Sequence, residues 1–319
     1  MAKHYLGIDV GGTNLVAGVV DEDYALIYKS ELPTDNKRTF GEVVRDIVKV
    51  AKAALAGAGL SETDIDRVGL GVPGAVNPHN KHVILAPNLR WKDADVIGEF
   101  RKSWDINVEI ANDADCAGVA EALAGAGVGY DNIIMLTLGT GVGGSVILDK
   151  RLFLGADGFG VEIGHMALVH GGARCACGLY GCFEAYASVT ALRRQSIDAM
   201  FTVRQSLMWE ECGHDLNRVN GRTAFDAARG GDETGRKVVD AYISYIAKGI
   251  ASLTTVLRPD VFMIGGGISN EGEYLLEPIR KLVSVGYYAP DVLPAPAIVK
   301  AKLGNDAGII GAALLGTQI

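Results

Sequence analysis

The sequence of 319 residues predicts an α/β protein of two domains, assembled from two related halves. The first half opens with residues 4–32, where alternating apolar residues indicate strands broken at Gly11-Gly12. The second half opens in the same way with residues 132–148, a strand, a glycine-rich turn and a strand. Each half later contains a buried strand that runs into glycines, at 67–76 and at 259–269.

Helices are expected between these strands. Apolar residues recur at helical spacing over 41–56, and a long helix with one apolar face begins near Asp232. Residues 108–127 predict a strand that ends at Ala111, then a turn and an alanine-rich helix. A further helix is expected within 271–285. The alternation of strands and helices is typical of α/β proteins.

Composition excludes several partners. The net charge is −8 and the pI about 5.3, so the chain lacks the basic surface that nucleic acid or an anionic membrane requires. The first residues lack the apolar core of a signal peptide, and no apolar run has the ~20 residues needed to span a bilayer. We therefore expect a cytoplasmic protein with reduced thiols, and the odd count of 5 cysteines fits that compartment.

Three glycine-rich loops are candidate phosphate or nucleotide sites. DVGGTN (9–14) combines an acid that suits Mg²⁺ with backbone N–H groups and a hydroxyl for phosphate oxygens, although a plain hairpin turn has the same pattern. GTGVGG (139–144) fits the dinucleotide fingerprint, but a β-like segment follows instead of a helix. A second phosphate loop is therefore preferred there, and GGG (265–267) suits the sugar and base of a nucleotide. The residues concerned are Asp9, Gly11, Gly12, Thr13, Thr140, Gly141, Gly265, Gly266 and Gly267.

Two such hairpin loops and a third glycine patch describe a nucleotide held in a cleft between two domains. This is the arrangement of the actin-like ATPase and sugar kinase fold, which is ribonuclease H-like.

In ANDAD (111–115), Asn112 and Asp113 follow a buried strand, where ligands of α/β sheets bind. A kinase that acts on an alcohol needs a carboxylate to accept the hydroxyl proton, and Asp113 is the candidate general base. The alternative role for Asp113 is a helix N-cap, for which we expect Asp115 instead.

Three cysteines lie within eight positions in CACGLYGC (175–182). Cys175, Cys177 and Cys182 with one histidine, His165 or His170, would make a closed tetrahedral zinc site of the structural kind. The redox interpretation lacks a CxxC pair, and the remaining alternative is buried cysteines without metal. Glu162, His165 and Glu184 flank the cluster, and with Asn88 they are candidates for hydrogen bonds to sugar hydroxyls or for a solvated rim.

Together these residues resemble the ROK family of repressors, open reading frames and sugar kinases. The resemblance covers essentially the whole chain and rests on these motifs: DVGGT, GVPG (71–74), NLRW (88–91), NDAD, GTGVGG, EIGH (162–165), CACGLYGC with Phe183-Glu184, and GNDAGIIGAALL (304–315). It implies that the last helix returns to the first domain. The expected domains are thus a small α/β domain of 1–112 plus 305–319 and a large α/β domain of 113–304 with the zinc loop.

Within that family the chain resembles glucose kinases, and the resemblance implies each role. ATP would phosphorylate the 6-hydroxyl of glucose with Asp113 as general base, and Mg²⁺ would assist. Structural Zn²⁺ would be held by His165, Cys175, Cys177 and Cys182, which leaves His170 aside. The sugar would contact the residues Asn88, Asn112, Asp113, Glu162, His165 and Glu184. The family also suggests a homodimer.

Three other functions compete with this one. A kinase for fructose, mannose, allose, N-acetylglucosamine or N-acetylmannosamine is the serious rival, because a few pocket contacts decide the sugar. A sugar-sensing repressor of the same family would carry a helix-turn-helix before DVGGT, where only eight residues precede Asp9. A chaperone-like or actin-like ATPase is disfavoured by the zinc cluster. The segment 196–223 aligns with no family motif.

Overall fold

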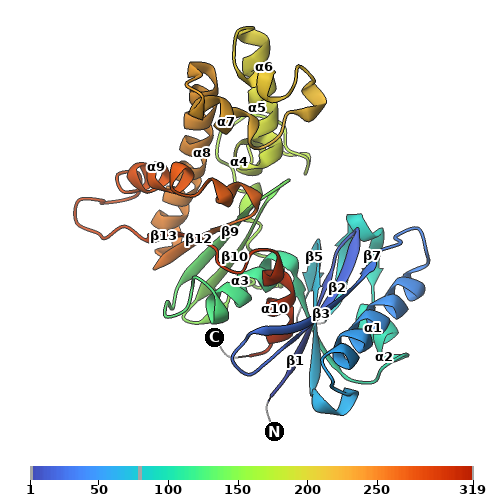
Figure 1. The fold of residues 1–319 in the computed structure, drawn as a ribbon. Coiled ribbons are helices and arrows are strands. Elements are labelled where there is room, and N and C mark those ends of the chain that lie inside the picture. Colours follow the sequence, from blue (N-terminus) through green and yellow to red (C-terminus); the bar gives the residue numbers. More distant parts are fainter. Residues whose placement is uncertain (1–2, 78–80, 318–319) are drawn as a thin grey trace. The chain divides into compact units, whose positions relative to one another are not determined.

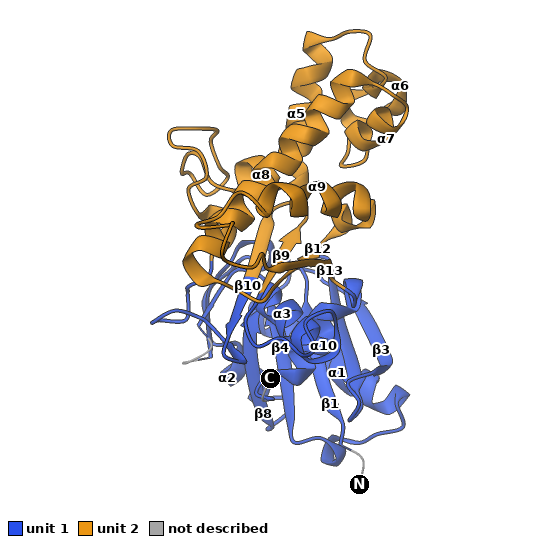
Figure 2. Cartoon of the chain, turned by 90° about the vertical axis from the view of Figure 1, so that its left-hand side faces the viewer, with its two compact units in different colours: residues 1–133, 145–161, 302–319 blue, residues 134–144, 162–301 orange. Residues whose placement is uncertain are grey.

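The structure is a computed structural model that describes residues 3–77 and 81–317 (Figure 1). The chain divides into two compact units, and each is described by itself. Unit 1 comprises residues 1–133, 145–161 and 302–319, and unit 2 comprises residues 134–144 and 162–301 (Figure 2). These limits differ from the domain limits expected at Asn112 and Asn305, which stay a prediction.

Unit 1 is built on a sheet with the strand order β3-β2-β1-β4-β8. Its strands are β1 (Tyr5–Val10), β2 (Asn14–Val20), β3 (Leu26–Pro33), β4 (Arg67–Val72) and β8 (Asn107–Asn112). The first three form antiparallel hairpins, whereas β1, β4 and β8 run parallel to one another. The predicted hairpins of the first half are confirmed, and the carboxyl ends of β1 and β8 fall at the same edge of the sheet.

The two faces of this sheet are covered by different helices. Leu6, Ile8 and Val10 of β1 belong to the apolar core that also contains Val43 and Ile47 of α1 (Phe40–Gly57). Alternation along the strand turns Gly7 and Asp9 to the opposite face. There a Cβ on Gly7 would lie 2.1 Å from the carbonyl oxygen of Ile309 in α10 (Ala307–Leu314), so α10 packs directly on the backbone of β1. The helix predicted over 41–56 is confirmed.

A second, smaller sheet of unit 1 was not expected from the sequence. It has the order β5-β6-β7, with β5 (Ala75–Asn77), β6 (His82–Ala86) and β7 (Trp91–Ala94), and a 3-10 turn at Pro87–Leu89 joins the last two strands. The helix α2 (Val96–Arg101) follows it. The remaining helix of interest is α3 (Asp113–Ala124), which starts immediately where β8 ends, so the turn predicted between them does not exist.

The sheet of the second half has the order β11-β10-β9-β12-β13, and the division between the units falls within β10. Its strands are β9 (Ile133–Leu138), β10 (Val142–Leu148), β11 (Arg151–Leu152), β12 (Val261–Gly265) and β13 (Ala297–Lys300). The strand, glycine turn and strand predicted over 132–148 are therefore confirmed. In unit 2, β12 and β13 pair in parallel.

The helices of unit 2 surround the long helix α8 (Glu233–Leu257), whose N-cap is the predicted Asp232. The others are α4 (Glu184–Ala187), α5 (Val189–Thr202), α6 (Met208–Glu211), α7 (Thr223–Arg229) and α9 (Glu273–Val283). Segment 196–223 thus forms the end of α5, all of α6 and the 3-10 turn Leu216–Arg218. Within residues 3–77 and 81–317, none of the helices combines the length and the apolar character that crossing a bilayer requires.

Candidate active site

The loop after β1 is held in shape by its own backbone and by Thr34. The N–H of Gly11 donates to the carbonyl oxygen of Asn14 at 2.9 Å, which closes the hairpin. Thr34 donates its N–H to the carbonyl oxygen of Thr13 at 2.7 Å and its hydroxyl to that of Gly11 at 2.7 Å. These contacts occupy the loop carbonyls and leave the loop rigid, as a phosphate site requires. Sequence reasoning missed Thr34, since nothing local marks it.

Asn88 lies against this loop. A Cβ on Gly12 would come within 3.0 Å of the Asn88 Cβ, so only glycine allows the close approach. The side chain of Asn36 donates to the backbone carbonyl of Asn88 at 3.0 Å and fixes the 3-10 turn that carries it. Asn88 itself is exposed. The structure therefore brings the predicted sugar candidate Asn88 beside the predicted phosphate loop.

Asn112 and Asp113 stand at the junction of β8 and α3. Asn112 caps the helix by accepting the N–H of Ala114 at 2.8 Å, and its amide donates to the carbonyl oxygen of Gly74 at 2.8 Å. The prediction that Asp115 caps this helix was wrong, because the N-cap is Asn112, three residues earlier, and Asp115 lies in the first turn. Asp113 is exposed, and its carboxylate also accepts the N–H of Ala114 at 2.9 Å.

Asp9 and Asp113 interact electrostatically within unit 1. Burial raises the pKa of Asp9 from 3.8 to about 6, and the negative charge of Asp113 adds to the effect. Burial also raises the pKa of the nearby Cys116 thiol well above its ordinary value, with smaller effects from Asp115, Asp9 and Asp113. Asp9, near the end of β1, and Asp113, directly after β8, therefore share one region of negative potential at the same edge of the sheet. Such a region attracts a cation, and its carboxylates can accept a proton from a bound ligand.

In unit 2 the loop at 139–144 is held by the start of α5. Gly139 donates its N–H to the carbonyl oxygen of Gly141 at 3.0 Å, and Val189 donates to that of Gly139 at 2.8 Å. The hydroxyl of Thr190 donates to the carbonyl oxygen of Thr140 at 2.7 Å. The loop thus resembles the loop at 9–14 in its construction, because its carbonyls are occupied by contacts with the protein. The third glycine patch, Gly265–Gly267, ends β12 and begins a 3-10 turn.

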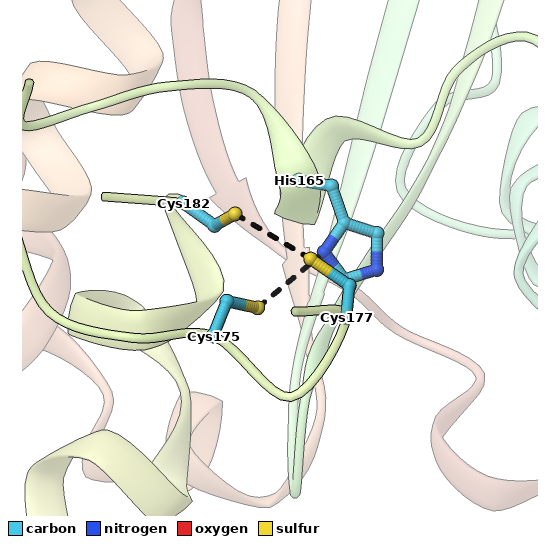
Figure 3. Close-up of side chains that lie close together, drawn as sticks. All are labelled: His165, Cys175, Cys177 and Cys182. Carbon is cyan, nitrogen blue, oxygen red and sulfur yellow. Dashed lines mark hydrogen bonds between the residues drawn. The ribbon is translucent and has the colours of Figure 1, made fainter. Parts of the chain in front are cut away.

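The cysteine cluster has the geometry of a metal site (Figure 3). One ligand atom from each of His165, Cys175, Cys177 and Cys182 lies within 4.8 Å of all the others. The contacts include Cys175 Sγ to His165 Nδ1 and Cys177 Sγ to Cys182 Sγ, both at 3.7 Å. The structure therefore selects His165 over His170, which the residue pattern alone left open. Three sulfurs and one imidazole nitrogen are the donor set of a closed zinc site, so these residues fit that metal.

Glu184 connects this cluster to the glycine loop. One carboxylate oxygen accepts the N–H of Val142 at 3.0 Å, and the other lies 3.5 Å from the Sγ of Cys175. A Cβ on Gly141 would lie 2.4 Å from the first oxygen, so the loop reaches Glu184 only because residue 141 is glycine. Glu162, the remaining sugar candidate of this unit, is exposed at the start of the 3-10 turn Ile163–His165.

The candidates therefore form two groups, one in each unit. Unit 1 contains Asp9, the loop at 11–13, Asn88 and the pair Asn112-Asp113. Unit 2 contains the loop at 139–144, Gly265–Gly267, the cysteine cluster and its two glutamates. In each group the side chains come from segments far apart in the sequence. They supply carboxylates, backbone N–H groups and a metal-binding cluster. Groups of these kinds are found in sites that transfer a phosphoryl group to a polyol.

Comparisons with known proteins show that the chain is similar to sugar kinases. The curated glucokinase of Thermotoga maritima is 35% identical over 309 residues, which cover 97% of this chain and 95% of the relative. The crystal structure of a ROK family glucokinase from Streptomyces griseus, in complex with glucose and AMPPNP, matches with a TM-score of 0.81 and 32% identity. That match covers 98% of each chain. The predicted actin-like fold is thereby confirmed.

Other relatives act on other sugars. An N-acetylgalactosamine kinase from a Shewanella species is 28% identical over 98% of this chain and 96% of the relative. The family model described as ROK family matches residues 5–319, and the resemblance inferred from the motifs is thus confirmed. The chain belongs to the ROK family.

Proposed function

We propose that this protein is a sugar kinase that transfers the γ-phosphoryl group of ATP to the 6-hydroxyl of glucose. The observation that carries the proposal is the electrostatic interaction of Asp9 with Asp113 at the carboxyl ends of β1 and β8, beside a glycine loop whose shape is fixed. Glucose is the preferred sugar because the full-length relatives named above include glucokinases from two organisms at 32% and 35% identity.

Asp113 would act as the general base. Its exposed carboxylate accepts the proton of the sugar hydroxyl while that oxygen attacks the γ-phosphorus. The new oxygen–phosphorus bond forms as the bond from the γ-phosphorus to the β-phosphate oxygen breaks, and ADP leaves. The N–H of Ala114 and the start of α3 hold the carboxylate in one orientation. Asn112 would contact the sugar beside it.

Asp9 and the glycine loops would hold the phosphates. The two carboxylates of Asp9 and Asp113 are suited to a Mg²⁺ ion, which when bound neutralises the charge that develops on the transferred group. Thr13 and the N–H of Gly12 would bind these phosphates, and Thr140 and Gly141 of unit 2 would also bind them. Gly11 would shape the loop, because its N–H donates to the carbonyl oxygen of Asn14. The bare backbone of Gly265–Gly267 would lie against the nucleoside.

The metal cluster would serve the sugar. A zinc ion held by the three cysteines and His165 would fix the imidazole, whose second nitrogen then points to a sugar hydroxyl. Glu162, Glu184 and Asn88 would complete the contacts with the hydroxyls. Because Glu184 also accepts the N–H of Val142, its carboxylate has a fixed position before any sugar binds.

A coupled assay with MgATP tests the proposal. Glucose, mannose, fructose, allose, N-acetylglucosamine, N-acetylmannosamine and N-acetylgalactosamine are compared by kcat/KM. We expect the highest value for glucose, and a higher value for an N-acetylhexosamine would assign the chain to the other kinases of the family. The variant Asp113→Asn should lose about 10²- to 10⁴-fold in kcat, because the proton of the hydroxyl has no acceptor. The matched control is Asp115→Asn on the same helix, and equal losses in both variants would refute the assignment of the base.

A further inference from the structure

Residues 34–36 form a short connection that the proposed mechanism does not use. They join the end of β3 to the start of α1, and none of them is among the groups proposed to bind a substrate. Both neighbouring elements are fixed, since β3 pairs with β2 as far as Pro33 and α1 belongs to the core of unit 1. A connection held at both ends can fix other parts of the unit against each other.

Thr34 connects this segment to the phosphate loop. Its N–H donates to the carbonyl oxygen of Thr13 and its hydroxyl donates to that of Gly11, each at 2.7 Å. The two bonds come from one residue and reach the loop on both sides of Gly12. A shift of the loop would therefore break at least one bond to Thr34.

Asn36 connects the same segment to the turn that carries Asn88. Its side-chain amide donates to the backbone carbonyl oxygen of Asn88 at 3.0 Å. The neighbouring Leu89 is buried in the core of unit 1, so the turn is held from inside as well. The exposed side chain of Asn88 thus extends from a backbone that has little freedom to move.

The bonds to the loop and to the turn are held at one separation. Asp35 lies between Thr34 and Asn36, and its carboxylate accepts the N–H of Lys37 at 3.1 Å, which closes a tight turn around Asn36. A second contact lies nearby, because Phe40 at the start of α1 packs edge-on against Trp91 of β7 with ring centroids 5.2 Å apart. All of these contacts lie within unit 1.

This separation matters for the proposed function, on which the inference rests. The loop at 11–13 would hold the phosphates of ATP and Asn88 would hold the sugar, so their spacing contributes to the distance between the hydroxyl oxygen and the γ-phosphorus. We infer that Thr34 and Asn36 are positioning residues, which set the spacing of the two substrates on unit 1. Loosening either bond leaves the groups that bind each substrate intact but spoils the alignment. A misplacement of about 1 Å lowers the rate of an aligned reaction about 10²-fold.

Three variants of the segment and one control test this. Thr34→Val removes the hydroxyl donor at nearly constant shape, and Asn36→Leu removes the amide donor without adding a charge. Thr34→Ser keeps the hydroxyl and should behave as the wild type does. The matched control is Thr39→Val, which also removes one hydroxyl, because Thr39 bonds instead to Glu42 and caps α1. The control lowers stability through the helix cap.

The expected result is a fall in kcat of tenfold or more in Thr34→Val and in Asn36→Leu, with KM for glucose and for ATP within threefold of wild type. The ratio of ATP hydrolysed to sugar phosphate formed should rise severalfold in both, because water reacts when the hydroxyl is misaligned. Thr34→Ser and Thr39→Val should keep the wild-type kcat per folded molecule and the wild-type ratio. Wild-type values in both impaired variants, or equal changes in Thr39→Val, overturn the inference.

The double variant Thr34→Val/Asn36→Leu gives a second test. The two bonds act in series on one spacing, so the loss of either releases it. The double variant should therefore lose little more in kcat than the worse of the two single variants. Losses that multiply would show that the two residues act separately, and that result also overturns the inference.

Hydrogen exchange keeps the inference testable without turnover. The N–H of Arg90 donates to the carbonyl oxygen of Pro87 at 3.1 Å and so reports on the turn that carries Asn88. It should exchange severalfold faster in Asn36→Leu than in wild type but not in Thr39→Val, and an unchanged rate in Asn36→Leu overturns the inference. Failure of the proposed function is distinct, because the wild-type protein then phosphorylates none of the sugars while this exchange still reports whether Asn36 holds the turn.

Discussion

Replacing Asp9 by asparagine should stabilise the protein without ligands while it abolishes activity. The carboxyl of Asp9 has its pKa raised from 3.8 to about 6 by burial and by Asp113. A raised pKa means that the folded protein holds the proton more tightly than the unfolded chain. Stability is therefore greatest when Asp9 is protonated and falls as the pH rises from about 4 through 6.

The magnitude follows from the shift. About 2.2 pKa units at 1.36 kcal/mol each give about 3 kcal/mol in total, of which about 1.4 kcal/mol is lost between pH 5 and pH 8. Because Asp9 is partly exposed, water screens part of this, and about 1 to 3 kcal/mol in total is expected. Asparagine has nearly the same shape and carries no charge, so Asp9→Asn should remove the pH dependence.

Urea unfolding at pH 5, 6, 7 and 8 with EDTA and without nucleotide measures the effect. Trp91 and Trp104 are buried in unit 1, so a Trp209→Phe background confines the fluorescence signal to that unit. The free energy of unfolding of Asp9→Asn should exceed that of the parent by an amount that grows with pH. A difference that is constant from pH 5 to pH 8, or a variant less stable at pH 8, would refute the reasoning.

Three further predictions concern the metal cluster, the core and a helix cap. Removing zinc by chelation, or the variant Cys177→Ser, should lower Tm and raise KM for glucose together, and an unchanged KM would reduce the cluster to a stabiliser of the fold. Gly69→Ala should cost roughly 3 kcal/mol or more in urea unfolding, because the new Cβ would lie 1.7 Å from the carbonyl oxygen of Ala312. Asp232→Ala should cost about 1 kcal/mol, since its carboxylate caps α8 through Gly235, while kcat/KM stays at the wild-type value.

Elements with strong periodicity could be predicted from the sequence. An apolar pattern with the period of a strand or a helix is visible within the segment itself for the hairpins before Pro33, for α1 and for α8. The small sheet β5-β6-β7 has no such pattern, because its strands have three to five residues and pair through turns that depend on distant contacts. Short strands of this kind are decided by tertiary packing.

The candidate site shows the same division. The residue types and their spacing pointed to the cysteines and the glycine loops but left both His165 and His170 open as the fourth ligand. The family resemblance implied His165, and the three-dimensional cluster contains it. The N-cap of α3 was misassigned to Asp115 because Asn112, Asp113 and Asp115 are all good caps, and the decision lies in where β8 stops. Thr34 binds the backbone carbonyls of Thr13 and Gly11, which are 21 or more residues away in the chain, and no sequence motif records such contacts.

The raised pKa of Asp9 shows that stability and the proposed function make opposite demands on this part of unit 1. A chain selected for stability alone would not place two carboxylates at the same edge of a sheet, where each raises the energy of the other's charge. The arrangement becomes favourable only when a cation and a phosphate share the region. Binding of the substrate then relieves the repulsion between the carboxylates and stabilises the folded protein.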